Sequence, residues 1–166
     1  DNVFMKLTGI RDIDNYTYLH SVDVCIYSVV AGKSMHLSHD EIANLGLGAI
    51  LHDMGKCKIP LDILNKPARL TKYEYEIIKK HTVLGYEIIR NTPGVSHSVA
   101  NIALCHHEHW DGTGYPLQRA GRDIETPGTL ILFFPLILPP LSARHISVSF
   151  CFSVTQRAIS PSSIKI

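Results

Sequence analysis

The feature that most constrains the fold is a run of helical patterns between residues 10 and 110. Over this stretch apolar and polar residues never alternate as they do in a half-buried β-strand. Apolar residues instead recur at helical spacing, first over residues 14–32. Ser38 and Glu41 then form an S-x-x-E capping box, which opens a second predicted helix that runs to about His52. The pattern predicts an all-α bundle.

Prolines and a second capping box divide the middle of the chain. Pro60 and Pro67 interrupt the segment after the second helix, so it is predicted to be a loop with at most one short turn. Thr71 and Glu74 repeat the capping-box pattern. They open a third predicted helix over residues 72–91. A fourth is predicted over residues 96–109.

Length and charge narrow the class of protein. The chain has 166 residues, of which 45% are hydrophobic and 19% charged, a composition typical of a globular domain. The net charge is +1 without a polybasic run, so neither a nucleic acid polymer nor an anionic membrane is an expected partner. The four cysteines form no C-x-x-C pair, which favours reduced thiols and a cytoplasmic location. Because the chain starts at Asp1, we expect it to be a piece of a longer protein.

Histidines are spread over the predicted helices in a regular way. Each of the four helices carries one histidine or an adjacent pair: His20, His52 with Asp53, His81, and His106 with His107. Imidazole and carboxylate groups are natural ligands for Mn, Fe or Zn, and helical bundles build such sites from side chains of facing helices. A lone histidine more often serves packing or the surface. We assign five to that class: His36, His39, His97, His109 and His145.

The joint order of several short motifs is the most specific signal. "HDMGK" (52–56) precedes the lone His81, and "HHEHWDGTGYP" (106–116) follows. With "YTYLHS" (16–21) and "GYPLQRAGRDI" (114–124), these residues closely resemble the HD-GYP family of bacterial cyclic di-GMP phosphodiesterases. The resemblance covers roughly residues 10–124, and the GYP element carries the subfamily assignment.

The resemblance implies an HD-superfamily helical bundle and a set of roles. The implied metal ligands are His20, His52, Asp53, His81, His106 and His107. Asp53 would bridge two metal ions, Fe or Mn, and Lys56 would meet the scissile phosphate. Gly114, Tyr115 and Pro116 would form a loop near the site that is also linked to partners such as GGDEF (diguanylate cyclase) or other signalling domains. Family members that bind a third metal carry a glutamate where this chain has Tyr16, so two ions are expected.

The chemistry of such a site follows from general principles. Two divalent ions about 3.5–4 Å apart can hold an anionic phosphodiester and lower the pKa of water towards about 7, so that hydroxide is available at neutral pH. Lys56 adds a cation for the phosphate. Glu108 and Asp111 are candidates for carboxylates that orient the imidazoles. Helix-end solvation and turn capping are equally open roles for both.

The pattern breaks near residue 128. We predict an HD-GYP domain over residues 1–128, truncated at its C-terminal end, and an aberrant tail over residues 129–166. Family members continue with a helix that carries a ligand aspartate and a "DALTS-x-RPY"-like run, whereas Phe150 and Ser153 stand here where aspartates should fall. The abrupt change favours an out-of-frame or degraded ending over a divergent one. The C-terminal helices are therefore predicted to be missing or disrupted, and one metal ligand with them.

Three functions are compatible with the sequence. The first is metal-dependent hydrolysis of cyclic di-GMP, a cyclic dinucleotide, to pGpG or GMP, with Asp53 and Lys56 as catalytic residues. The second is a catalytically impaired HD-GYP module that acts in binding or regulation, because the last aspartate is absent. The third is a generic HD-type nucleotide phosphohydrolase, against which the GYP run argues.

Overall fold

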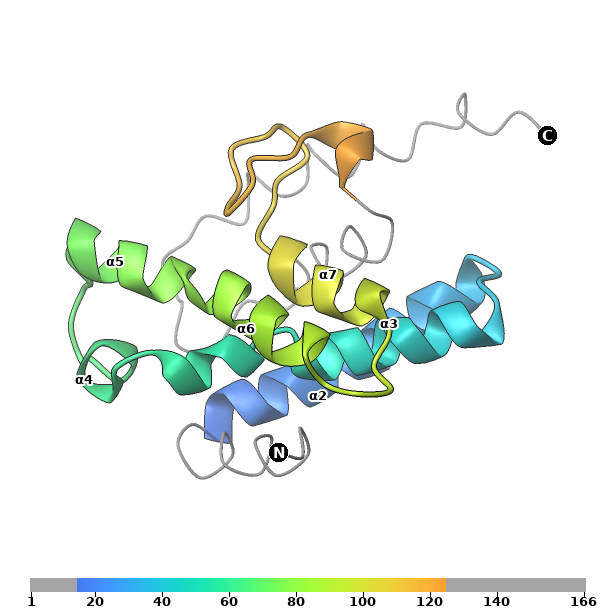
Figure 1. Cartoon of the computed structure of the whole chain (residues 1–166), viewed down its shortest axis with the longest axis horizontal. Coiled ribbons are helices and arrows are strands. Elements are labelled where there is room, and N and C mark those ends of the chain that lie inside the picture. The colour runs from blue at the N-terminus through green and yellow to red at the C-terminus, as the bar shows by residue number, and fades with distance from the viewer. Residues whose placement is uncertain (1–14, 125–166) are drawn as a thin grey trace. The chain divides into compact units, whose positions relative to one another are not determined.

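The regular elements in the part of the chain that the structure describes are helices. The computed structural model describes residues 15–124 (Figure 1). Its elements are α2 (Asn15–Ser34), α3 (His39–Leu51), the 3₁₀ helix η1 (Met54–Lys58), α4 (Leu61–Leu64), α5 (Lys72–Lys79), α6 (His81–Arg90), α7 (His97–Cys105) and the 3₁₀ helix η2 (Gly121–Asp123). Between residues 15 and 124 the only extended pairing is an isolated bridge between Asp111 and Ala120. The predicted all-α fold is confirmed.

The predicted tail lies outside the described residues. The chain divides into two units, Asp1–Phe134 and Pro135–Ile166, and the described residues all belong to the first. The proposed boundary between residues 128 and 129, and the missing or disrupted C-terminal helices, therefore stay predictions. None of the helices in residues 15–124 is long and apolar enough to cross a membrane.

Both predicted capping boxes form. Ser38 Oγ accepts from the Glu41 amide at 3.4 Å, and Glu41 Oε2 accepts from the Ser38 amide at 2.8 Å. Thr71 and Glu74 make the same reciprocal pair at 3.2 and 2.7 Å. Each box satisfies backbone donors that the first turn of a helix leaves without a partner. The boxes thus fix where α3 and α5 begin.

The third predicted helix is broken where it was expected to be continuous. It divides at Lys80 into α5 and α6. The cause is competition for backbone carbonyls, because His81 Nδ1 donates to the Ile78 carbonyl at 2.7 Å and the Thr82 hydroxyl donates to the Lys79 carbonyl at 3.0 Å. His81 therefore lies at the start of α6 and not in the middle of a longer helix.

The fourth helix is shorter than predicted. α7 ends at Cys105, and the prediction that it runs to residue 109 is wrong. The chain leaves the helix through a tight turn in which the Glu108 amide donates to the Cys105 carbonyl at 2.9 Å. The Tyr115 amide then donates to the His107 carbonyl at 3.0 Å, which folds the following loop back over the end of α7.

Helix α7 is the centre of the packing. It packs against both α3 and α6, and α2 packs along α3 (Figure 1). One buried cluster lies between α3, η1, α6 and α7: Leu51, Met54, Ile89, Val99, Ala100 and Ala103. A second joins α2 to α3 and α7: Val24, Leu45, Ala49 and Ile102. These contacts hold the ends of α3 and α7 beside the start of α6.

Gly55 permits the closest of these contacts. A Cβ atom at Gly55 would collide with the backbone carbonyl oxygen of His81 and would lie 2.6 Å from the Gly85 amide nitrogen. Neither neighbour is a side chain that can rotate away. Only glycine therefore lets η1 lie against α6.

We predict that Gly55→Ala lowers the free energy of unfolding by about 3 kcal/mol, since overpacking a rigid contact costs about 1–3 kcal/mol or more. Urea denaturation followed by circular dichroism measures it. Gly32→Ala is the matched control, because a Cβ there would meet only side-chain ends at 3.2–3.4 Å. Equal midpoints for the two variants would contradict the packing role of Gly55.

Candidate metal centre

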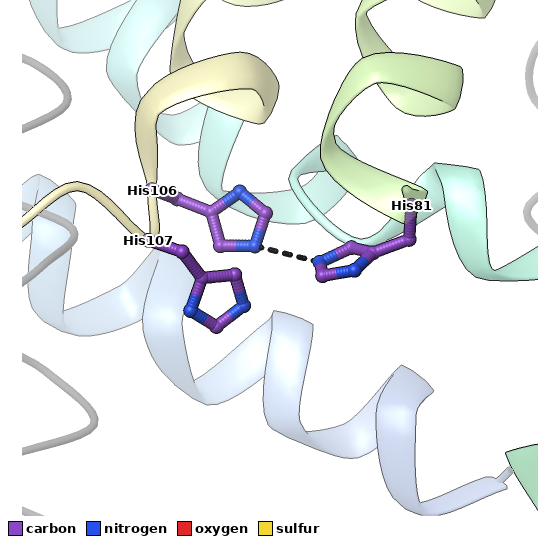
Figure 2. Close-up of side chains that lie close together, drawn as sticks. All are labelled: His81, His106 and His107. Atoms are coloured by element: carbon purple, nitrogen blue, oxygen red, sulfur yellow. Dashed lines mark hydrogen bonds between the residues drawn. The ribbon is translucent and has the colours of Figure 1, made fainter. Parts of the chain in front are cut away.

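The predicted ligands come together from α2, from the C-terminal ends of α3 and α7 and from the start of α6. Two groups form, His81 with His106 and His107, and His20 with His52 and Asp53. Within each group the candidate ligand atoms lie within 4.8 Å of one another. Figure 2 shows the first group, in which side chains from the start of α6 and the end of α7 point toward one another. Residues that are up to 87 positions apart in sequence thus share one site.

Three of the histidines are held in the same way. The Nδ1–H groups of His52, His81 and His106 donate to the carbonyls of Ala49, Ile78 and Ala103, at 2.6, 2.7 and 2.9 Å. Each acceptor is the carbonyl three residues earlier, at a helix end where carbonyls lack a helical partner. Because a carbonyl oxygen can only accept, Nδ1 must carry the proton. In the neutral ring Nε2 then presents its lone pair to the site.

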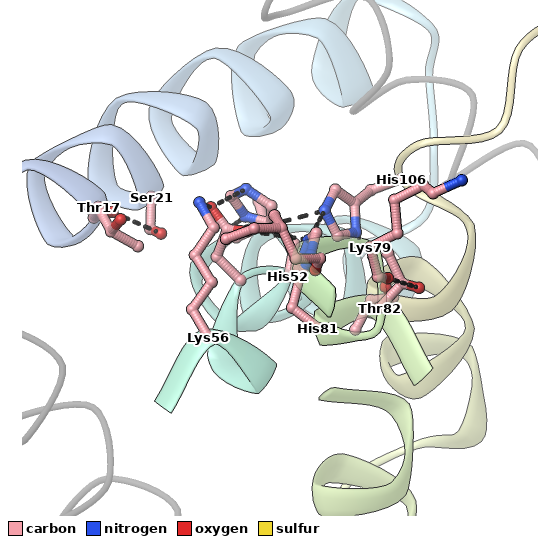
Figure 3. A network of polar contacts seen from close by, with 12 residues as sticks. Thr17, Ser21, His52, Lys56, Lys79, His81, Thr82 and His106 are labelled. Carbon is pink, nitrogen blue, oxygen red and sulfur yellow. Dashed lines mark hydrogen bonds and ion pairs between the residues drawn. The ribbon is translucent and has the colours of Figure 1, made fainter. Parts of the chain in front are cut away.

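These lone pairs face one another. His81 Nε2 and His106 Nε2 are 3.1 Å apart (Figure 3). His81 Nε2 is also 3.4 Å from Asp53 Oδ1. Asp53 Oδ1 is buried and has no hydrogen-bond partner among the described residues. Acceptors buried against acceptors are unfavourable unless a cation lies among them. The residues present therefore fit a bound metal ion.

Asp53 connects the two groups. Its Oδ2 atom is 2.8 Å from Lys56 Nζ and 3.2 Å from His52 Nε2, while Oδ1 faces His81 and His106. Burial by itself raises the pKa of Asp53, but nearby positive charge, that of Lys56 above all, outweighs burial and holds that pKa well below its usual range. The carboxylate is thus ionised, with one oxygen directed at each group.

Burial keeps several of the imidazoles in the form that binds metals. It lowers the pKa of His20 and of His81. Burial lowers the pKa of His107 to about 3. The pKa of His106 lies well below its ordinary value, first because the ring is buried and second because His107 is its neighbour. A metal competes with protons for nitrogen, so a low pKa favours the metal at neutral pH.

Gly114 brings the GYP loop against the ligand pair. A Cβ at Gly114 would collide with the backbone of Glu108 and His109, so glycine is required for this close approach. The next residue, Tyr115, stacks its ring on His107 with 4.6 Å between centroids and 19° between planes. Pro116 follows in the same loop and lines the adjoining cleft. The GYP residues thus form a wall beside His107.

The structure gives Glu108 and Asp111 roles other than orienting imidazoles. Glu108 is fully buried, and its two carboxylate oxygens accept from the amides of Leu117 and Arg119 at 2.6 and 2.8 Å. Asp111 accepts from the amide and the hydroxyl of Thr113 at 2.9 and 2.6 Å. Backbone amides therefore occupy the Glu108 carboxylate. That Glu108 also orients an imidazole stays a prediction. Turn capping, the other role considered, describes Asp111.

A cleft of about 770 Å³ opens beside the histidines. Its lining includes Lys56, His81, His107 and Tyr115, together with Tyr75 and Lys79 from α5. No sequence motif marks Tyr75 or Lys79 as part of the site. Their only signal is that both precede His81 on one predicted helix, with a spacing of four residues that places them on one face.

The histidines assigned to packing or the surface do not join the candidate ligands, although His109 lines the adjoining cleft. His36, His39, His97 and His109 are exposed, and neither group of candidate ligands includes them. His97 contacts the Tyr86 ring, and His109 Nδ1 lies 3.0 Å from the Thr113 hydroxyl. His145 lies outside the described residues. The spacing of the motifs thus separated the converging histidines from the rest.

Comparison with known families identifies the class of protein. A family model described as HD domain matches residues 20–133. The chain belongs to this family. The match confirms the resemblance drawn from "HDMGK" and the GYP run. Among solved structures, an HDG"Y"P protein of Bdellovibrio bacteriovorus is similar to this chain. That structure is 25% identical with a TM-score of 0.60, and the alignment covers 75% of this chain and 42% of the other.

Curated relatives bear names of one enzyme class. A cyclic di-GMP phosphodiesterase of Pseudomonas aeruginosa is 37% identical over 74% of this chain and 30% of its own length. Another of Thermotoga maritima is 38% identical over 78% of this chain and 35% of its own. A 3'3'-cGAMP-specific phosphodiesterase of Vibrio cholerae is 36% identical over 69% and 22%. The chain thus spans about a third or less of these relatives.

We predict that Glu108→Ala lowers the free energy of unfolding by about 2 kcal/mol, because it removes the acceptor from two part-buried amides, and an unsatisfied buried donor costs about 1–3 kcal/mol. Urea denaturation measures the change. Glu87→Ala is the control, since its pair with Arg90 is exposed and 3.6 Å long. A Glu108 variant as stable as the control would show that the GYP loop does not depend on this carboxylate.

Proposed function

We propose that this chain is the catalytic domain of a metal-dependent phosphodiesterase that hydrolyses cyclic di-GMP to pGpG or GMP. The observation that carries the proposal is the position of Asp53, whose two oxygens face two separate groups of histidines. Relatives named cyclic di-GMP phosphodiesterases at 37–38% identity support the substrate. Cyclic dinucleotides are the substrate class that the names of the relatives share.

The site would hold two divalent ions, Fe or Mn. His81, His106 and His107 would bind one and His20 and His52 the other, with a carboxylate oxygen of Asp53 directed to each. Nitrogen and carboxylate donors without a thiolate suit these metals. When bound, the ions would neutralise the phosphodiester and supply hydroxide at neutral pH.

The remaining residues of the site would bind and orient the substrate. Lys56 lines the cleft and is held at 2.8 Å by Asp53, so its ammonium group is positioned for the scissile phosphate. Tyr115 would form the wall of the cleft beside His107. The cleft of about 770 Å³ is within the range of small-molecule sites, roughly 300–1,000 Å³.

Contacts of the GYP loop with GGDEF or other signalling domains, and a cytoplasmic location, belong to the same proposal. The loop offers the exposed Leu117 at its surface, next to Pro116. The Glu108 carboxylate holds this part of the loop by accepting from the Leu117 amide at 2.6 Å.

A catalytically impaired module is the second candidate. The observation in its favour is the absence of aspartates at Phe150 and Ser153. A site that lacks one ligand of a metal pair could still bind a dinucleotide or a partner.

We predict that the full 166-residue chain, supplied with Mn(II) or Fe(II), hydrolyses cyclic di-GMP, and that Asp53→Asn reduces turnover at least 100-fold, about the loss expected when a group central to a metal pair is removed. Chelation with EDTA should abolish the activity, and returned metal should restore it. Chromatographic separation of pGpG and GMP measures the products.

Asp62→Asn on the exposed face of α4 is the matched control and should keep full activity. Circular dichroism of both variants verifies folding. A folded, metal-loaded chain without turnover would contradict the enzymatic proposal and favour the impaired module. Hydrolysis of nucleoside monophosphates in place of cyclic di-GMP would indicate a generic HD-type phosphohydrolase.

A further inference from the structure

The cleft has an aromatic wall that the ligand set does not explain. Tyr75 on α5 lies edge to face with Tyr115, with ring centroids 6.4 Å apart. Lys79 Nζ is 5.5 Å from the Tyr75 ring centre and 5.6 Å from that of Tyr115, and it pairs with Glu76 at 2.6 Å. The Lys79 ammonium group thus contacts rings of both α5 and the GYP loop.

Tyr75 remains open to the cleft. Its side chain is 46% exposed and lines the cavity that also contains His81 and His107. Tyr115, by contrast, is covered by His107 and Lys79. A large aromatic ring that stays half exposed in a concave site is a platform for a flat ligand.

The position of Tyr75 relative to the ligands suits a nucleotide. Two successive ring contacts, of 4.6 and 6.4 Å between centroids, lead from His107 through Tyr115 to Tyr75. A nucleotide carries its base one sugar away from its phosphate. A phosphate held at the histidines and Lys56 would therefore bring a base into the region of the Tyr75 ring.

We propose that Tyr75 is the residue on which a nucleobase of the substrate stacks, with Lys79 as the residue that positions its ring. The identity of the whole substrate rests on the proposed function. The stacking of a base on Tyr75 rests only on the geometry of the cleft. It adds to the phosphate-binding site a base-binding subsite on α5. Stacking requires the ring and not the hydroxyl group.

The test compares two ligands that differ only in the base. GMP and ribose 5-phosphate share the sugar and the phosphate, and neither contains the phosphodiester bond that is cleaved. Isothermal titration calorimetry gives Kd for each with the Mn(II)-loaded full chain. We expect GMP to bind more tightly, and Tyr75→Ala to reduce that preference about 5- to 150-fold, the range for loss of one base stacked on an aromatic ring.

Two further variants separate stacking from other causes. Tyr75→Phe keeps the ring and should keep the preference for GMP. Tyr73→Ala removes a tyrosine that is 76% exposed on the same helix and does not line the cleft, so it should leave both Kd values unchanged. Ribose 5-phosphate should bind equally to all four proteins, because its phosphate site is intact.

Three results would overturn the inference: equal or no binding of the two ligands by the unsubstituted chain, an unchanged preference in Tyr75→Ala, or an equal loss in Tyr75→Phe. None depends on turnover of cyclic di-GMP. A chain that shows the expected preference but no hydrolysis would refute the proposed activity and leave the subsite standing. Hydrolysis of cyclic di-GMP together with an unchanged preference for GMP in Tyr75→Ala would support the proposed activity and refute the base-binding subsite.

Discussion

Buried acceptor atoms that face one another are the constraint on which the site depends. His81 Nε2 and His106 Nε2 lie 3.1 Å apart, and Asp53 Oδ1 is buried beside them with no hydrogen-bond donor from residues 15–124. Such an arrangement costs free energy in a folded protein, because each acceptor atom has lost its hydrogen bonds to water and has no donor in their place. A cation converts the same arrangement into a favourable one, which links the stability of the domain to the binding of metal.

The fold provides this arrangement mainly through the ends of its helices. His52 and His106 cap the C-terminal ends of α3 and α7, and His81 follows the break between α5 and α6. At each place a carbonyl that a longer helix would have used accepts from Nδ1 and fixes the ring. The interruptions in the helices therefore orient the ligands, and Gly55 and Gly114 let the neighbouring backbone approach closely.

Local features of the fold were predictable from the sequence because their signals are local. The capping boxes at Ser38 and Thr71 formed as predicted, since each depends on residues within one turn. The break at Lys80 was missed, because it depends on side chains that compete for carbonyls in a segment with a continuous helical pattern. The order of the HD and GYP motifs identified which histidines converge. It could not indicate that Glu108 binds backbone amides, since its partners lie in a loop whose path only the folded chain defines.

The central claim is that Asp53 stands between two metal ions. Anomalous diffraction from crystals of the Mn(II)-loaded chain tests it most directly. The account predicts two manganese peaks, one beside His81, His106 and His107 and the other beside His20 and His52, with one oxygen of Asp53 directed to each. A single peak remote from Asp53, or peaks only at surface histidines such as His36 and His39, would contradict it.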